Sequence, residues 1–325
     1  MKYLHDRAKG KFQFFLTGLL VAALTFACQS PSGDLSPNAQ SSTDCRTIEH
    51  VLGEVCVPAE AQRLISLDHS TFANALALGV QPVGTSISDR PIIPEYLGNY
   101  ANQVEFLGSS SGPNLEKVVQ LTPDLIVGVK QVGEPIFQQL SQIAPTALGN
   151  WRGYPSWREH FEFVANVLGK EDEAAKVWEK YDQKVKGVQA ALENQSQDME
   201  VSVIYAWAGA GIIIDAENSF AGSILADVGF RRPESHAAVD GGTIRISEER
   251  IPEIDSDILF VSVFDSDSEK VLAEWQQKPL WNQLKAVQND QVYVVNGEIW
   301  RSGNPIAANL VLDELLQILS SNQTT

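Results

Sequence analysis

Short apolar runs alternate with amphipathic segments through the first half of the chain. The apolar runs have the length of buried strands, and the segments between them have helical spacing. The predicted strands are residues 63–68, 82–85 and 124–129, and the predicted helices are residues 70–78, 114–121 and 138–143. Gly79 ends the first of these helices, and Pro145 follows the last one. Because strands that alternate with short helices form parallel sheets, this half is predicted to be an α/β lobe.

The middle of the chain is predicted to be helical. Ser156 and Glu159 have the spacing of a capping box, and the helix that they begin is expected to end near Gly169. A second helix is expected at residues 171–192. Its apolar stripe consists of Ala174, Val177, Trp178, Tyr181, Val185, Val188 and Leu192. Such a helix is roughly 33 Å long, enough to cross between two lobes, although a plain surface helix would have the same pattern.

The alternation of strands and helices resumes after the long helix. Further elements are expected at residues 201–206, 212–214, 220–228, 258–263 and 292–295, before a closing helix at residues 305–320. Gly209 and Gly211 lie between the first two of these segments and indicate a turn. Because the body of about 280 residues exceeds what one core usually holds, we expect a second α/β lobe here.

An internal repeat relates the two halves. Residues 114–127 align with residues 247–260, with a capping residue, an acid, a base and aliphatic residues at matching offsets. Glu116 pairs with Glu249, Lys117 with Arg250, and Asp124 with Asp257. Common helix-to-strand chemistry would produce part of this match. The shared acidic positions nevertheless indicate two pseudo-symmetric lobes.

The chain begins with the pattern of an export signal. Four basic residues precede an almost wholly apolar stretch at 12–27, which is too short for a typical membrane span and is followed at once by Cys28. This pattern predicts a lipoprotein that is cleaved after Ala27 and lipidated on Cys28; ordinary secretion or an uncleaved anchor are the alternatives. The polar tract to about Thr43 is predicted to be a flexible tether.

Two further cysteines, Cys45 and Cys56, lie eleven residues apart. Exported compartments are oxidising, so a disulfide is expected, with a metal-binding pair as the alternative. The formal net charge of the chain is −17. Because residues 1–27 contribute four positive charges and one negative charge, the mature chain would carry −20. Nucleic acid and anionic lipid are therefore poor partners, and an anionic ligand would need a local basic pocket.

Several segments in this order resemble the iron-siderophore substrate-binding proteins of ABC importers, a family that also has cobalamin- and haem-binding members. The similar segments begin at Arg63 (RLISLD), Ala77 (ALGVQPVG), Asn114 (NLEK), Thr122 (TPDLIV), Ile143 (IAPT) and Val292 (VYVVNG). The resemblance covers roughly residues 45–319, and the paired cysteines are similar to the start of cyanobacterial members.

The resemblance implies a class III periplasmic binding protein fold, in which one long helix joins two Rossmann-like α/β lobes and allows only modest closure. The expected divisions are a signal peptide (1–27), a tether (28–43), an N-terminal lobe (44–150), a linker with the long helix (151–195) and a C-terminal lobe (196–325). The resemblance also implies one exposed glutamate on each lobe that docks onto a permease dimer. These residues correspond to Glu116 and Glu249.

Enzymatic chemistry finds little support in the sequence. None of the five histidines has metal-ligand spacing with another histidine or a cysteine, and no nucleophile elbow, phosphate loop or dinucleotide fingerprint occurs. His69 follows a predicted strand end, where it could line a pocket or stabilise a turn. The rival hypotheses are a siderophore esterase and a purely adhesive surface lipoprotein.

Basic and aromatic residues in the predicted cleft loops are the candidate ligand contacts. They are Arg90, Lys130, Trp151, Arg152, Tyr205, Trp207, Arg231, Arg245, Trp300 and Arg301. Arginine and lysine neutralise anionic oxygens and aromatic rings cover an organic chelate, so an anionic ferric siderophore is preferred to haem or cobalamin. Such a ligand brings its own iron coordination, so no directly bound metal or cofactor is expected. We expect a monomer in the periplasm, anchored to the cytoplasmic membrane.

Overall fold

The computed structural model describes residues 45–87, 93–109, 112–193, 199–207, 209 and 211–321. The predicted signal peptide, the tether, Cys28 and Arg90 lie outside the described residues. No helix in these ranges is both long enough and apolar enough to cross a membrane.

The N-terminal lobe is built on a five-stranded parallel sheet in the order β5-β4-β3-β6-β7. Its strands are β3 (Leu64–Ser66), β4 (Gly84–Ile87), β5 (Glu105–Ser109), β6 (Leu125–Val129) and β7 (Thr146–Gly149). Its helices are α1 (His69–Ala77), α2 (Leu115–Gln120), α3 (Lys130–Gly133) and α4 (Phe137–Ile143). Asp68 begins α1 by accepting a hydrogen bond from Thr71 N, and Asn114 begins α2 in the same way from Lys117 N.

A disulfide-linked hairpin precedes this sheet. Strands β1 (Cys45–His50) and β2 (Gly53–Pro58) pair antiparallel, and the Cα atoms of Cys45 and Cys56 are 5.5 Å apart, which confirms the expected disulfide. Arg46 donates hydrogen bonds of 2.8 and 2.7 Å to the carbonyls of Asn166 and Val167 in the last turn of a helix. The guanidinium thereby satisfies helix-terminal carbonyls and attaches the hairpin to the lobe.

The C-terminal lobe has a mixed sheet in the order β10-β9-β8-β11-β12. Its strands are β8 (Val201–Ala206), β9 (Ile212–Asp215), β10 (Thr243–Ile246), β11 (Ile258–Val263) and β12 (Val292–Asn296). Strands β8, β11 and β12 are parallel, whereas β9 is antiparallel to both of its neighbours. The helices of this lobe are α7 (Phe220–Val228), α8 (Ser266–Gln276), α9 (Lys285–Gln288), α10 (Gly297–Trp300) and α11 (Pro305–Ser321).

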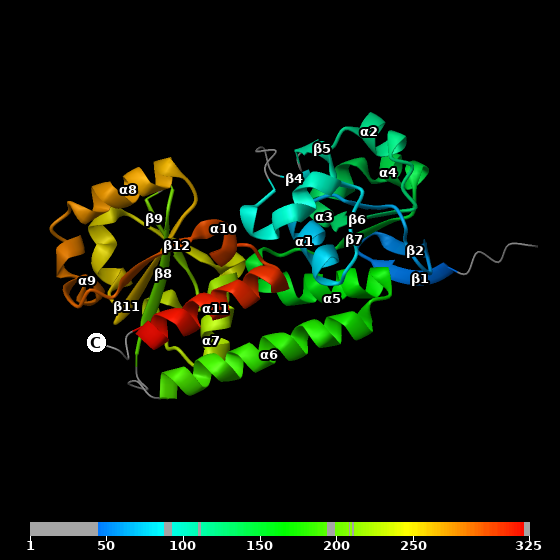
Figure 1. Ribbon diagram of the computed structural model, residues 1–325. Coiled ribbons are helices and arrows are strands. Elements are labelled where there is room, and N and C mark those ends of the chain that lie inside the picture. The colour runs from blue at the N-terminus through cyan, green and yellow to red at the C-terminus, as the bar shows by residue number, and fades with distance from the viewer. Residues whose placement is uncertain are drawn as a thin grey trace, which may run out of the picture. The chain divides into compact units, whose positions relative to one another are not determined.

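The long helix α6 (Glu171–Glu193) joins the two lobes and lies beside α11 (Figure 1). Ala174, near its start, belongs to the apolar core of the N-terminal lobe, whereas Tyr181, Val185 and Val188 belong to the core of the C-terminal lobe. The predicted fold class of two α/β lobes linked by one long helix is therefore confirmed, and a plain surface helix is excluded.

Helix α5 (Trp157–Leu168) also contacts both lobes. Its later residues, such as Phe161 and Val164, pack into the N-terminal lobe, while Trp157 packs against Phe220 of α7. Gly169 ends the helix in the left-handed conformation (φ +63°), as expected. The predicted capping box is wrong, because the Ser156 hydroxyl hydrogen-bonds within the preceding turn and not to the first turn of α5.

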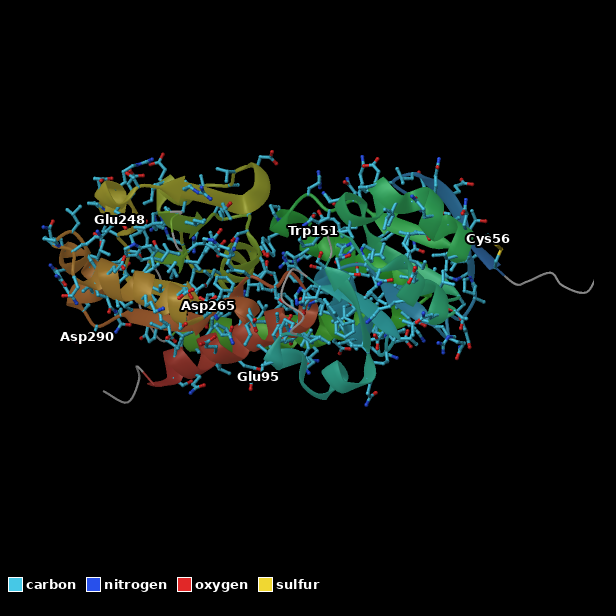
Figure 2. The ribbon with its side chains drawn as sticks, turned by 90° about the horizontal axis from the view of Figure 1, so that it is seen from above. Cys56, Glu95, Trp151, Glu248, Asp265 and Asp290 are labelled. Atoms are coloured by element: carbon cyan, nitrogen blue, oxygen red, sulfur yellow. A yellow bond between two sulfur atoms is a disulfide. The ribbon has the colours of Figure 1, made fainter. Side chains whose placement is uncertain are left out.

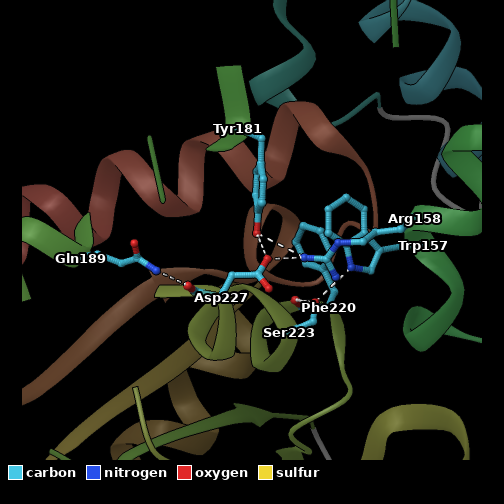
Figure 3. Close-up of polar contacts among 7 residues, drawn as sticks. All are labelled: Trp157, Arg158, Tyr181, Gln189, Phe220, Ser223 and Asp227. Atoms are coloured by element: carbon cyan, nitrogen blue, oxygen red, sulfur yellow. Dashed lines mark hydrogen bonds and ion pairs between the residues drawn. The ribbon is translucent and has the colours of Figure 1, made fainter. Parts of the chain in front are cut away.

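Figure 3 shows the polar contacts where α5 and α6 meet the C-terminal lobe. Arg158 of α5 and the Tyr181 hydroxyl of α6 both donate to the Oδ2 atom of Asp227, at 2.5 and 2.6 Å. The indole of Trp157 donates to the Ser223 hydroxyl at 3.1 Å. Burial and the hydrogen bond to Asp227 raise the pKa of Tyr181, so its hydroxyl remains a donor at neutral pH. Side chains of both connecting helices thus hold α7 in place.

The structure gives a physical reason for part of the internal repeat. The Asp124 carboxylate accepts hydrogen bonds from the backbone N–H groups of Gln62 and Arg63, just before β3. The Asp257 carboxylate accepts one from Glu200 N, just before β8. Each aspartate precedes a strand that pairs in parallel with the strand it tethers. The repeated acid therefore performs the same structural task in both lobes.

Candidate ligand-binding site

A cavity of about 320 Å³ lies between residues of the two lobes. It is lined by Asp68, His69, Ser70, Val129, Trp151, Tyr154 and Ser302. The first four come from the carboxyl ends of β3 and β6, where parallel α/β sheets usually bind ligands. Trp151 and Tyr154 come from the segment after β7, and Trp151 is seen between the lobes in Figure 2. Ser302 completes the cavity from the C-terminal lobe.

The turn at residues 301–304 brings the C-terminal lobe to this cavity. Gly303 has a φ of +69°, and a Cβ atom there would lie 3.0 Å from the Trp151 ring and 3.2 Å from the Tyr154 ring. Only glycine combines this backbone conformation with so close an approach. Asn304 accepts a hydrogen bond of 3.0 Å from Ala307 N and thereby begins α11.

Tyr96 of the N-terminal lobe is held by this turn. Its hydroxyl hydrogen-bonds to the Ser302 hydroxyl, accepts from Asn304 Nδ2 at 2.9 Å, and lies 3.2 Å from His69 Nε2. Burial raises the pKa of Tyr96 to about 12. Burial also lowers the pKa of His69. Both groups are therefore neutral near pH 7, so the lobes are joined here by hydrogen bonds between uncharged side chains.

Arg301 carries a positive charge to the edge of the same region. Its guanidinium carbon lies 3.7 Å from the centre of the Tyr205 ring and 5.0 Å from that of Tyr154. Its Nε atom donates to Asp215 Oδ1 at 3.3 Å, and only 12% of the Arg301 side chain is exposed. Asp215 counteracts the effect of burial and raises the pKa of Arg301, so the guanidinium remains charged.

Aromatic residues extend the site at the carboxyl ends of β8 and β11. Tyr205 is buried and packs edge-on against Phe264, which also contacts Trp207 at a ring-centre distance of 6.2 Å. The side chain of Trp207 is 56% exposed. A large exposed ring beside buried aromatic residues is suited to covering an organic ligand.

A family model described as "Periplasmic binding protein" matches residues 64–298, which is more than half of the chain. The chain belongs to the periplasmic binding protein family. The expectation of a binding protein rather than a siderophore esterase is confirmed by this membership and by the relatives below.

Curated relatives and solved structures agree with this assignment. The binding protein is 32% identical to "Probable siderophore-binding lipoprotein YfiY" of Bacillus subtilis over 91% of this chain and 94% of the relative. It is 29% identical to "Fe(3+)-citrate-binding protein YfmC" of the same organism, over 87% and 88%. The crystal structure of Staphylococcus aureus SirA complexed with staphyloferrin B has a TM-score of 0.75 and 30% identity, and the match covers 85% of this chain and 98% of SirA. Neither organism is a cyanobacterium, so these relatives do not support the expected cyanobacterial origin.

Three of the other sequence-predicted contacts follow or neighbour residues of the site. Lys130 directly follows the cavity-lining Val129, and its Nζ atom is 3.7 Å from Glu134 of the same segment. Arg152 lies between Trp151 and Tyr154 and is mostly exposed, with Glu159 at 4.0 Å. Arg245 shares a register position with Tyr205, since both pair with Ile213, and its side chain is exposed. The ion pairs of Lys130 and Arg152 are exposed, so neither cation is held in a buried ion pair.

Two predicted contacts lie elsewhere. The Trp300 side chain is fully buried, stacks on Phe260 and donates its indole N–H to Glu314 at 2.6 Å, so it belongs to the core of the C-terminal lobe. Arg231 pairs with Glu200 at the amino end of β8, opposite the strand end that carries Tyr205. Neither position suits ligand contact, and both were misplaced by sequence reasoning.

Several residues of the site were missed or undervalued. The predicted contacts did not include Tyr96, Asp215, Phe264 and Ser302. For His69, the sequence did not distinguish a residue that lines the pocket from one that stabilises a turn. Asp68 has a structural role: its carboxylate accepts from Thr71 N and Val129 N and from the Thr71 hydroxyl, which is 3.0 Å from His160 Nε2. Its position before a helix was the only sequence signal for this network. Among the described residues, no group of three potential metal ligands occurs.

The predicted docking glutamates are both exposed. Glu116 lies in the first turn of α2, and Glu249 lies in the 3₁₀ segment Glu248–Ile254. The neighbouring bases are engaged within their own lobes: Lys117 is 2.6 Å from Glu105, and Arg250 is 2.5 Å from Glu253. A hydrogen bond from the Ser247 hydroxyl lowers the pKa of Glu249, so this carboxylate is ionised at neutral pH.

We expect Tyr96→Phe to weaken the junction between the lobes. The change removes the hydroxyl shared by Ser302 and Asn304, which are almost completely buried, and should lower the free energy of unfolding by about 1–3 kcal/mol. Urea denaturation at pH 7 measures this value. Tyr293→Phe removes a hydroxyl that donates to Gln291, the residue just before β12; this variant is the control and should cost less.

The same pair of proteins gives a pH test. A tyrosine whose folded-state pKa is raised from 10 to about 12 stabilises the fold below pH 10, and this contribution is lost as the pH rises through 12. The difference in stability between wild type and Tyr96→Phe should therefore shrink over this range. A difference that stays constant from pH 8 to 12 would contradict the assigned pKa.

Proposed function

We propose that this protein captures a ferric siderophore, an anionic iron chelate, in the cleft between its lobes and delivers it to an ABC permease dimer. The observation that carries the proposal is Arg301, a largely buried cation stacked on Tyr205 beside the cavity. In a chain with a net charge of −17, a cation kept at this place is unusual and would attract an anionic ligand.

The relatives support the same ligand class. YfiY is named a probable siderophore-binding lipoprotein, YfmC an Fe(3+)-citrate-binding protein, and SirA was solved with staphyloferrin B. The proposed ligand contacts in the present chain are Arg90, Lys130, Trp151, Arg152, Tyr205, Trp207, Arg245 and Arg301. The iron travels inside the chelate as cargo and needs no protein ligand.

Haem fits the described cavity less well. An axial ligand would have to be a histidine or a tyrosine, and the described cavity wall offers His69 and Tyr154. Burial raises the pKa of Tyr154 and so disfavours the phenolate that would bind iron, which leaves His69. Its Nε2 atom already hydrogen-bonds to the Tyr96 hydroxyl. Binding to a haem iron through this nitrogen would break a contact of the junction between the lobes.

We expect Arg301→Ala, Arg245→Ala and Lys130→Ala each to weaken ferric siderophore binding by about 1–3 kcal/mol, because each removes a charged hydrogen-bond donor. Tryptophan fluorescence quenching with ferric citrate and ferric staphyloferrin B measures the affinity. Arg231→Ala, at the far end of β8, is the matched control and should bind as wild type does. The anionic-chelate hypothesis fails if the tightest ligand is uncharged and indifferent to all three changes.

Glu116 and Glu249 are proposed to dock the loaded protein onto two equivalent basic sites of the permease dimer. Support comes from the repeat, which gives both lobes an exposed carboxylate at the same offset. Ion pairs at the rim of an interface mainly set orientation and association rate. Local stabilisation of the first helical turn is the competing explanation for both residues.

The double variant Glu116→Ala with Glu249→Ala should abolish uptake while ligand affinity and thermal stability stay near wild type. Transport of radioactive iron into cells or proteoliposomes that contain the cognate permease measures uptake. Glu95→Ala with Glu134→Ala removes two other acids and is the charge-matched control. Normal transport by the docking variant would refute the docking role, and unfolding would favour the capping explanation.

Cys28 is proposed as the site of a lipid anchor that holds the protein at the outer face of the cytoplasmic membrane. Its position after an apolar stretch and the lipoprotein name of YfiY support this step. Stable attachment needs more than one acyl chain, and a serine has no thiol to carry the lipid. Cys28→Ser should therefore move the protein from the membrane fraction to the soluble fraction. Equal membrane retention of both forms, measured by fractionation and immunoblotting, would exclude the anchor.

A further inference from the structure

Three charged residues of the C-terminal lobe lie together: Asp215 is buried between Arg232 and Arg301, which are partly buried. Asp215 is the last residue of β9, and only 2% of its side chain is exposed. Its Oδ1 atom accepts from Arg301 Nε at 3.3 Å, and its main-chain oxygen accepts from Arg232. Among the described residues, Asp215 Oδ2 has no hydrogen-bond partner.

The contacts of Arg301 leave one edge of its guanidinium available. Nε is the nitrogen that bonds to Asp215, and no hydrogen bond joins either terminal nitrogen to another described residue. These two nitrogens are also not among the buried polar atoms that lack a partner. With its plane stacked on Tyr205 and Nε held by Asp215, the guanidinium presents the paired donors that suit a carboxylate.

The carboxylate of Asp215 opposes anion binding as far as charge alone is concerned. Burial raises the pKa of Asp215 above its usual value, and the charges of Arg301 and Arg232 offset part of that rise by favouring the ionised form. Burying such a charge is costly unless it is paired. Two arginines and one ionised aspartate leave a net charge of about +1, the same as Arg301 alone would supply. Asp215 therefore adds no attraction for an anion, and its contribution to binding must be geometric.

We infer that Asp215 is a positioning residue: it fixes the orientation in which Arg301 meets an anionic group of the ligand. The inference rests on the proposed function, since it assigns Asp215 a role in the same binding site. The competing explanation is that Asp215 serves only as a counter-ion for the two partly buried arginines.

Asp215→Asn separates these explanations by the sign of its effect. The change raises the net charge of the three residues to about +2, so a purely electrostatic role predicts tighter binding of an anionic chelate. A positioning role predicts weaker binding, by about 5- to 30-fold, because the neutral amide oxygen that remains is a weaker acceptor than the carboxylate and holds the guanidinium less firmly. Fluorescence titration with ferric staphyloferrin B and ferric citrate gives the affinities. An unchanged or tighter complex overturns the inference.

A charge-balanced variant controls for the loss of the counter-ion of Arg232. Asp215→Asn leaves Arg232 with less compensation, so Asp215→Asn combined with Arg232→Gln restores the net charge of about +1. If Asp215 positions Arg301, this double variant still binds weakly. Wild-type affinity in the double variant would show that only the charge balance mattered, and would refute the inference.

A double-mutant cycle tests whether Asp215 acts through Arg301. In the Arg301→Ala background, Asp215→Asn should cause less than a twofold further loss of affinity, because the group that it positions is already absent. Full additivity of the two losses would assign Asp215 a general structural role. This readout does not depend on overall stability, provided that both proteins are folded at the temperature of the titration.

Asp227→Asn is the matched control. Asp227 also pairs with an arginine, Arg158, but on α7 against the connecting helices, where it lines no part of the cavity (Figure 3). Its replacement should leave ligand affinity within twofold of wild type. If wild-type protein binds neither ferric chelate, the proposed function fails with these probes; if it binds them and Asp215→Asn binds equally well, the positioning role alone fails.

Discussion

The contact between the turn at residues 301–304 and the N-terminal lobe is the constraint on which the site depends. Four consecutive residues perform three different tasks there. Arg301 supplies charge, Ser302 and Asn304 hold the Tyr96 hydroxyl, and Gly303 permits close contact with Trp151 and Tyr154. Because Asn304 also begins α11, a shift of this turn would move a helix that packs against α6 and α1. The cavity and the connection between the lobes are therefore mechanically coupled.

The sequence predicted several buried elements because burial leaves a clear pattern, although the fully buried strand β7 was not predicted. Residues 201–206, 220–228 and 258–263 have the bounds of β8, α7 and β11. The direction of β9 was not predictable in this way, since an antiparallel strand of four buried residues has the same composition as a parallel one. Likewise, the hydroxyl of Ser156 could serve the first turn of a helix or the preceding turn, and spacing did not distinguish the two.

Sequence reasoning failed most clearly to distinguish two adjacent residues that lie in different environments. Trp300 and Arg301 were predicted together, yet Trp300 points into the core, while Arg301 stacks on Tyr205 near the cleft. Composition favours both as ligand contacts, and only the tertiary position of the short helix α10 separates them. Tyr96 was missed for a related reason, because its partners Ser302 and Asn304 are more than two hundred residues away in the chain.

The distribution of polar groups shows how pseudo-symmetric lobes can specialise. The repeat is retained where it serves the fold, as in Asp124 and Asp257, and where it places an exposed glutamate on each lobe. At the cleft the lobes differ. The junction groups of the N-terminal lobe, His69 and Tyr96, are neutral, and its cation Lys130 is exposed. The C-terminal lobe instead places Arg301 in a largely buried ion pair with Asp215. A largely buried cation in one lobe can meet an anion while the cations of the other lobe, such as Lys130, stay exposed to solvent. Closure then requires no second buried charge, whose desolvation would oppose it.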